Sequence, residues 1–176
     1  MTMRQKILAL TLCCLGVAAA ADTYIPGTRV SYRLGKDAIT DSNTSHLFVD
    51  EATNDDYIEF FCEKGQPIFY LNSTTEILSE EDYDDDKTPN LIFRVDSQTP
   101  KTIPTVTVNQ SDDPDDYSHL STLAVEDKND PLIFSAFKNA SSKVAIRVTR
   151  SNGRELTFTF PVKGFTQALA KINNCK

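Results

Sequence analysis

The stretch Lys143–Cys175, KVAIRVTRSNGRELTFTFPVKGFTQALAKINNC, decides the fold, because its hydrophobic pattern, its turn residues and a cysteine all agree. Residues 143–150 alternate apolar and polar side chains, and residues 155–162 do the same. A period of two is typical of strands with one buried face. We therefore predict two half-buried strands joined by a short turn.

The length of that turn follows from the side chains that it brings together. A two-residue Asn152-Gly153 turn would pair apolar residues with polar ones, whereas a three-residue Ser151–Gly153 loop pairs Val148 with Leu156. We predict the three-residue loop, with Gly153 in the left-handed conformation that forms a bulge.

After Gly164 the apolar residues recur with a helical period. One stripe holds Phe165, Ala168, Leu169 and Ile172, and Cys175 extends the same stripe. The sequence therefore predicts a C-terminal helix that points its cysteine toward the sheet.

The N-terminus has the order of a secretory signal peptide. Arg4 and Lys6 precede an apolar run that ends in the small residues Ala18–Ala21. We predict cleavage after Ala20 or Ala21, so that residues 1–21 are the signal peptide and residues 22–176 form one domain in a periplasmic or secreted protein. The alternative is a retained membrane anchor, although the apolar run is short for a spanning helix.

Cleavage would remove two of the four cysteines, Cys13 and Cys14, and leave Cys62 and Cys175. Two cysteines in an exported chain are expected to form one disulfide. A redox pair or a metal site would need a C-x-x-C motif or neighbouring histidines, which the sequence lacks around these residues.

The charge of the chain is acidic, with a formal net value of −7. Loss of Arg4 and Lys6 would leave 16 basic against 25 acidic residues, a net charge of −9. Such a surface disfavours nucleic acid and anionic membrane, and it favours a basic protein partner.

The rest of the chain is rich in short strand patterns. Strands are expected at residues 28–34, 46–50, 57–63, 67–72, 90–96, 103–109 and 120–126. Residues 57–63 and 67–72 form the simplest hairpin, and residues 131–139 are expected to form a short helix with Asp130 as its N-cap. The predicted fold is mainly β, an antiparallel sandwich or curled sheet with this helix and the C-terminal one.

Two acidic clusters interrupt the strands, at residues 80–86 and 112–116, and the segment 78–88 is expected to be a surface loop. They are candidate contacts for a basic partner through Asp84, Asp85, Asp86, Asp112, Asp113, Asp115 and Asp116. The alternative is a weak calcium site, but the spacing lacks the glycine and glutamate of an EF-hand. We therefore predict no metal site and no cofactor.

Arg94 and Asp96 are spaced by two on a predicted strand, so their side chains are expected on one face. We predict an ion pair at a strand edge. The alternative is a ligand-binding role for the two residues.

Catalytic motifs are absent from the sequence. His46 and His119 are its two histidines, and His119 follows Asp115, Asp116 and Ser118. A catalytic triad is defined by spatial roles, which neighbouring sequence positions do not supply. The chain also lacks G-x-S-x-G, H-E-x-x-H and phosphate-loop motifs.

The succession of features resembles a known family. A mid-chain Cys62, the segment LIFRVD at Leu91–Asp96 and the ending RELTFTFPVKGFTQALAKINNC at Arg154–Cys175 are similar to the type VI secretion-associated accessory proteins (VasI-like). The terminal strand and helix also resemble the invasion-associated locus B family. The resemblance implies an exported accessory protein.

From the sequence we expect an exported, non-catalytic binding or accessory protein, associated with a bacterial secretion system if the resemblance holds. The first alternative is an acidic inhibitor of a basic secreted enzyme such as a lysozyme. The second alternative is a hydrolase that uses His119.

Overall fold

The computed structural model describes residues 21–109 and 118–176. The predicted signal peptide lies outside these residues except for Ala21. Within the described residues, no helix has the length and the apolar character that crossing a membrane requires.

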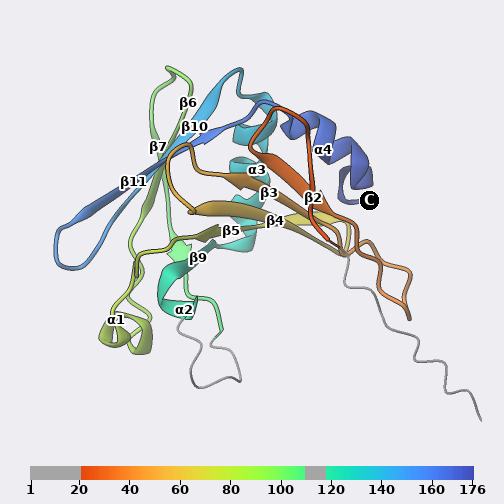
Figure 1. Cartoon of the computed structure of the whole chain (residues 1–176). Coiled ribbons are helices and arrows are strands. Elements are labelled where there is room, and N and C mark those ends of the chain that lie inside the picture. The colour runs from red at the N-terminus through yellow and green to blue at the C-terminus, as the bar shows by residue number, and fades with distance from the viewer. Residues whose placement is uncertain (1–20, 110–117) are drawn as a thin grey trace, which may run out of the picture.

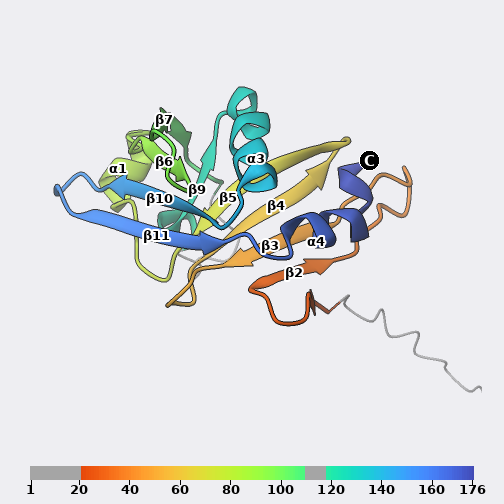
Figure 2. The same cartoon turned by 90° about the horizontal axis from the view of Figure 1, so that it is seen from above.

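Two antiparallel sheets and four short α-helices make up the fold (Figures 1 and 2). The strands of the large sheet are β1 (Thr23–Tyr24), β2 (Val30–Arg33), β3 (His46–Asp50), β4 (Tyr57–Glu63), β5 (Gln66–Asn72), β8 (Thr105–Val106) and β9 (Thr122–Val125). Those of the small sheet are β6 (Leu91–Val95), β7 (Lys101–Ile103), β10 (Lys143–Thr149) and β11 (Glu155–Pro161). The helices are α1 (Glu80–Asp84), α2 (Ser118–Ser121), α3 (Asp130–Asn139) and α4 (Phe165–Lys171). The strand order is β1-β2-β3-β4-β5-β9-β8 in the large sheet and β11-β10-β6-β7 in the small one, so the mainly β, antiparallel prediction is confirmed.

The hairpin β10–β11 has the predicted register. Val148 pairs with Leu156 and Ile146 with Phe158. Two backbone hydrogen bonds close the turn. The Arg150 N–H donates to the Arg154 carbonyl, and the Gly153 N–H donates to the Arg150 carbonyl. Gly153 has φ +78°, a conformation that costs glycine little because it has no Cβ. The three-residue loop is therefore confirmed.

One hydrophobic core fills the space between the inner sides of the two sheets and helices α3 and α4. Phe60 of β4 is its centre, because its ring contacts Phe69 of the same sheet and three rings from the helices. The ring centroids lie 5.3 Å from Phe134, 5.4 Å from Phe137 and 5.6 Å from Phe165. These edge-to-face contacts join α3 and α4 to the large sheet.

The C-terminus is fixed by the predicted disulfide. Cys62 and Cys175 are bonded, with their Cα atoms 5.0 Å apart, and both side chains are fully buried. The apolar stripe of α4 faces the core as expected, since Phe165, Ala168 and Leu169 are buried. The helix itself ends at Lys171, and a 3₁₀ turn (Asn173–Cys175) brings the cysteine to β4.

The acidic segment 78–88 is not the loop that its polarity predicted. It contains α1, which Ser79 caps by accepting a hydrogen bond from the Asp82 N–H at 3.1 Å. The Asp82 carboxylate accepts hydrogen bonds from the Ser79 and Ser151 hydroxyls, both at 2.7 Å. Acidic residues in a first helical turn are stabilised by the helix dipole, so this composition favours a short capped helix.

Two predicted strands are shorter than expected. The segment 103–109 divides at Pro104, which has no N–H to donate, and the chain passes there from β7 in the small sheet to β8 in the large one. In the segment 120–126, Leu120 belongs to α2, and the strand β9 begins at Thr122.

Asp130 has a different role from the N-cap that was predicted. Helix α3 begins at Asp130 after a 3₁₀ turn (Asp127–Asn129), and the N-cap position is Asn129. The Asp130 carboxylate is buried and accepts the Phe69 backbone N–H at 2.8 Å. Burial raises its pKa to about 6, and the nearby charge of Asp127 adds to this shift.

The first prediction concerns the disulfide. Replacing both Cys62 and Cys175 with Ala should lower the free energy of unfolding by about 4 kcal/mol, because a cross-link across 113 residues restricts the unfolded chain. Urea denaturation of the oxidised protein and the double variant measures the difference. Equal midpoints would contradict the prediction.

The second prediction concerns Asp130. A raised carboxyl pKa stabilises the fold below the ordinary pKa, and this contribution is lost as pH rises to about 6. Asp130→Asn keeps an acceptor for the Phe69 N–H and removes the charge, so it should stabilise the protein at pH 7.5 by on the order of 2 kcal/mol and have a much smaller effect at pH 4. Urea denaturation at both pH values measures this, with the exposed Asp55→Asn as the control.

Candidate functional site

The two sides of the large sheet differ in what covers them. On β4, Ile58, Phe60 and Cys62 point into the core, whereas Tyr57 and Phe61 lie on the other side and are half-buried. Strand pairing places further aromatic and charged residues on that other side. We call it the aromatic face, and define it by Tyr24, Arg33, His46, Phe48, Tyr57, Glu59, Phe61 and Tyr70.

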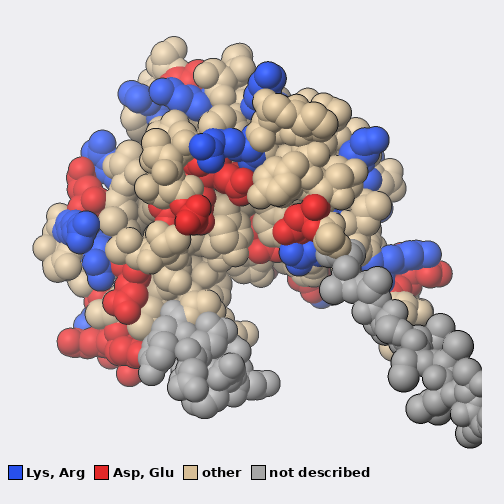
Figure 3. Space-filling view, in the orientation of Figure 1, with Lys and Arg blue, Asp and Glu red and all other residues tan. Residues whose placement is uncertain are grey.

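The described helices α3 and α4 pack against the opposite side of the sheet, where Phe134, Phe137 and Phe165 meet Phe60. In Figure 1, α3 lies behind the strands and the aromatic face is turned toward the viewer. Figure 3 shows acidic side chains among uncharged ones in the middle of this view. Tyr24 is 57% exposed, so the face offers aromatic surface to a ligand.

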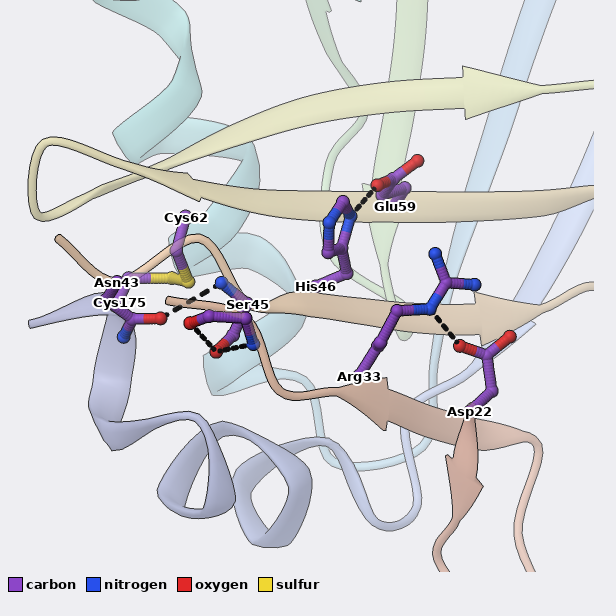
Figure 4. A network of polar contacts seen from close by, with 9 residues as sticks. Asp22, Arg33, Asn43, Ser45, His46, Glu59, Cys62 and Cys175 are labelled. Atoms are coloured by element: carbon purple, nitrogen blue, oxygen red, sulfur yellow. Dashed lines mark hydrogen bonds and ion pairs between the residues drawn. A yellow bond between two sulfur atoms is a disulfide. The ribbon is translucent and has the colours of Figure 1, made fainter. Parts of the chain in front are cut away.

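His46 is the centre of the aromatic face (Figure 4). Its Nδ1 atom is hydrogen-bonded to the Glu59 carboxylate on the neighbouring strand. The imidazole stacks on Phe48, with centroids 5.9 Å apart and planes within 6°, and its centroid lies 4.9 Å from that of Phe61. Cross-strand pairs of this kind fix the rings in place before any ligand arrives.

Arg33 joins the charged and aromatic parts of the face. Its guanidinium carbon lies 5.3 Å from the Phe48 ring centroid, and its Nε donates to Asp22 Oδ1 at 2.8 Å. A guanidinium over an aromatic ring and beside a carboxylate is a cation–π site with its counter-ion. The face therefore already holds one cation of its own.

Carboxylates raise the pKa of the tyrosines around this centre. The charge of Asp50 is the main reason that the pKa of Tyr24 is raised. Burial followed by the charge of Glu59 raises the pKa of Tyr57 and of Tyr70. These phenols therefore stay neutral and keep their hydroxyl protons at physiological pH.

The arrangement around His46 consists of aromatic rings, a carboxylate and a hydrogen-bonded imidazole. Among the described residues, the hydrogen-bonding partner of the His46 ring is Glu59, with no serine, threonine or cysteine in the position of a nucleophile. In the described part of the chain, no three His, Cys, Asp or Glu side chains are grouped so as to hold a metal ion. Aromatic side chains are enriched at protein binding surfaces, so the rings of this face are a candidate contact surface.

Asp84, Asp85 and Asp86 of the first acidic cluster are exposed and lie at the end of α1. Asp84 is its last residue, Asp85 pairs with Lys87 at 2.6 Å, and Asp86 accepts a hydrogen bond from the Thr107 hydroxyl at 3.3 Å. The predicted contacts Asp112, Asp113, Asp115 and Asp116 lie outside the described residues.

Arg94 and Asp96 do not form the predicted ion pair. Asp96 follows β6 with φ +48°, and its carboxylate accepts the backbone N–H groups of Ser141, Ser142 and Lys143 at 2.8 to 3.0 Å. The Arg94 side chain is exposed on β6, which is a central strand of its sheet. The positive φ turns the chain away from the strand, so the spacing of two no longer places both side chains on one face.

His119 is buried, with 1% of its side chain exposed. Its ring packs edge-on against Tyr83 at 4.5 Å between centroids, and its Nε2 lies 3.9 Å from a Glu80 carboxylate oxygen. A histidine in this position holds α1 against α2, and a substrate would have to displace both elements to reach it.

The aromatic face does not follow from the alternation of apolar residues, because that pattern marks only the side of each strand that fits the core. In YIEFFCE, residues 57–63, the aromatic Tyr57 and Phe61 fall out of phase with Ile58, Phe60 and Cys62. In PIFYLN, Ile68 and Tyr70 do the same against Phe69 and Leu71. Adjacent strands with apolar residues on both sides need a covering layer on each side. The predicted helices supply a layer for one side, so this pattern indicates a second, uncovered apolar face.

The comparisons with known proteins found no family model, no curated protein and no solved structure that matches this chain.

The third prediction concerns the charge beside Tyr24. Asp50→Asn removes the main cause of its raised pKa, so the pKa of Tyr24 should fall. Spectrophotometric titration of the phenols, with the Tyr24 signal assigned by NMR, measures the change. Asp41→Asn, on a separate exposed loop, should leave Tyr24 unchanged, and an unchanged Tyr24 in the Asp50 variant would contradict the assignment.

Proposed function

We propose that the protein is an exported, non-catalytic binding or accessory protein, and that its aromatic face contacts a partner protein through basic groups on that partner. The observation on which this rests is the half-exposed set of rings and carboxylates around His46. The resemblance to secretion-associated accessory proteins supports an accessory role in a bacterial secretion system, and the buried disulfide is compatible with an oxidising compartment.

Charge complementarity favours a basic partner. The carboxylates of Asp50, Glu59 and Glu63 project from the same side of β3 and β4, and Asp22 lies beside them. The cations near these four carboxylates are Arg33, which pairs with Asp22, Arg29, whose charge acts on Asp50, and Lys64, which pairs with Glu63. Lysine and arginine side chains from a partner would meet both ring faces and carboxylates there. The position of Arg33 over Phe48 is the arrangement that we expect a partner's cation to repeat.

The size of the face sets the expected strength of binding. Strands β1 to β5 are about five residues long on average, and five strands of this length about 4.8 Å apart present roughly 400 Å². A standard interface buries about 800 Å² on each partner. We therefore expect a transient complex with a Kd in the micromolar range, unless loops beside the sheet add to the contact.

The alternative is an inhibitor of a basic secreted enzyme such as a lysozyme. It would bind through the same charge complementarity, but binding would stop the activity of the enzyme. The third candidate, a hydrolase that uses His119, has little support from a side chain that is 1% exposed. Inhibition of lysozyme by the purified protein separates the first alternative from an accessory role.

The fourth prediction tests the aromatic face. Phe48→Thr and Tyr70→Thr remove a ring and keep a residue that strands tolerate, so each should weaken binding to the partner about ten-fold or more. The partner is first recovered from periplasmic extract with the wild-type protein, and its affinity is then measured with purified components. Leu132→Gln, which removes an exposed apolar side chain from α3, is the matched control.

Melting temperatures of all variants must be compared with that of the wild type, so that loss of fold is recognised. Binding that survives both aromatic variants with unchanged affinity would contradict this role for the face. A separate variant tests the acidic clusters by placing Asn at Asp84, Asp85, Asp86, Asp112, Asp113, Asp115 and Asp116. If the clusters steer the partner, this variant should associate more slowly, and its association rate should depend less on salt. Asp82 is left unchanged because its carboxylate accepts hydrogen bonds from Ser79, the N-cap of α1.

A further inference from the structure

The small sheet has an exposed face with the opposite charge. Arg94 on β6 and Arg147 on β10 are both exposed, and they lie diagonally across the two central strands, because Arg94 pairs with Ala145 and Arg147 pairs with Ile92. Diagonal neighbours on one face of a sheet lie within reach of each other's long side chains. Figure 3 shows lysine and arginine side chains toward the upper left, over the region where Figure 1 draws β6, β10 and the turn to β7.

A pocket of about 190 Å³ lies between these two arginines. Ala145 is the smallest residue in this part of the face, and its short side chain leaves the depression. Ile92 and Pro100 add apolar walls, and Thr157, opposite Arg147 on β11, adds a hydroxyl. The pocket therefore combines two guanidinium groups and one hydroxyl with an apolar floor.

The acidic groups near the pocket compensate the charge of Arg147 in part and leave Arg94 without an ion pair among the described residues. Glu155 contacts Arg147 at 3.4 Å through partly exposed side chains, a distance at which a surface ion pair is weak. Asp96 lines the neighbouring cavity with Arg94, but its carboxylate is held by three backbone N–H groups. Among the described residues Arg94 has no ion pair with a carboxylate.

We infer that this pocket binds a small carboxylate that bears an apolar chain, with the carboxylate between Arg94 and Arg147 and the chain over Ala145. Guanidinium groups bind carboxylates through paired, charge-assisted hydrogen bonds, and the Thr157 hydroxyl is placed to donate one more. The apolar floor favours such a ligand over an inorganic oxyanion, because an inorganic oxyanion has no apolar chain to cover the floor. This site is separate from the aromatic face and does not depend on the function proposed for it.

The test uses the full mature protein at low ionic strength and three probes: hexanoate, its neutral analogue hexanamide, and inorganic phosphate. NMR titration that follows the Nε–H signals of the arginines reports binding at each residue. We expect hexanoate to shift the Arg94 and Arg147 signals with a Kd in the millimolar range, because so small a ligand makes few contacts. Hexanamide should produce no saturable shift, and phosphate should bind more weakly than hexanoate.

Five variants locate the site. Arg94→Gln and Arg147→Gln should each weaken hexanoate binding about ten-fold, and Ala145→Val should weaken it similarly by filling the floor without a change in charge. Arg154→Gln, at the tip of the hairpin, removes the same charge outside the pocket and should leave the affinity within about two-fold of wild type. Glu155→Gln should strengthen binding, because it frees Arg147 from its competing partner.

Three results would overturn the inference. The first is the absence of saturable hexanoate binding in the wild-type protein. The second is phosphate affinity equal to that of hexanoate, which would make the pocket a general oxyanion site. The third is equal weakening by Arg94→Gln and Arg154→Gln, which would reduce the effect to net charge.

Discussion

Burial of Phe60 is the constraint on which the arrangement of this protein depends. Its ring meets Phe69 within the large sheet and Phe134, Phe137 and Phe165 from the helices, and these contacts fill the inner side of the sheet. Phe137 extends the cluster to Phe160 of β11, so that the small sheet is attached to the same core. With the inner side filled, the rings on the outer side of β3, β4 and β5 have no described layer to pack against, and they pack on each other. The candidate site is therefore a consequence of how the core is built.

The parts of the fold that the sequence predicted are those set by local periodicity and by one covalent bond. The register of β10 and β11 followed from matching Val148 to Leu156, and the direction of Cys175 followed from its place on the stripe of α4. In both cases the information lies within a few residues, and the disulfide to Cys62 supplied the long-range contact. These predictions needed no knowledge of what the rest of the chain does.

The predictions that were wrong depended on long-range contacts. The acidic segment forms α1 partly because Asp82 accepts a hydrogen bond from Ser151, 69 residues away. Asp130 does not act as an N-cap, because its carboxylate accepts the Phe69 N–H across the core. The pairing of His46 with Glu59 likewise requires the register of β3 against β4. The spacing of two along one strand made Arg94 and Asp96 a candidate pair, whereas the pocket that we propose is lined by Arg94 and by Arg147, 53 positions away. A site assembled across strands cannot be obtained from spacing along one strand.

The net charge of −7 is the sum over the chain, and two surfaces of the protein differ in the sign of their local charge. The aromatic face holds carboxylates among tyrosine and phenylalanine rings, and the exposed face of the small sheet holds two arginines around a shallow pocket. Charges on an exposed surface are screened beyond a Debye length of about 8 Å, so a ligand responds mainly to the charges close to its own binding surface. Under the two functions that we propose, the net acidity acts on the first approach of a partner, and residues such as Glu59 on the large sheet and Arg94 on the small sheet select the ligand.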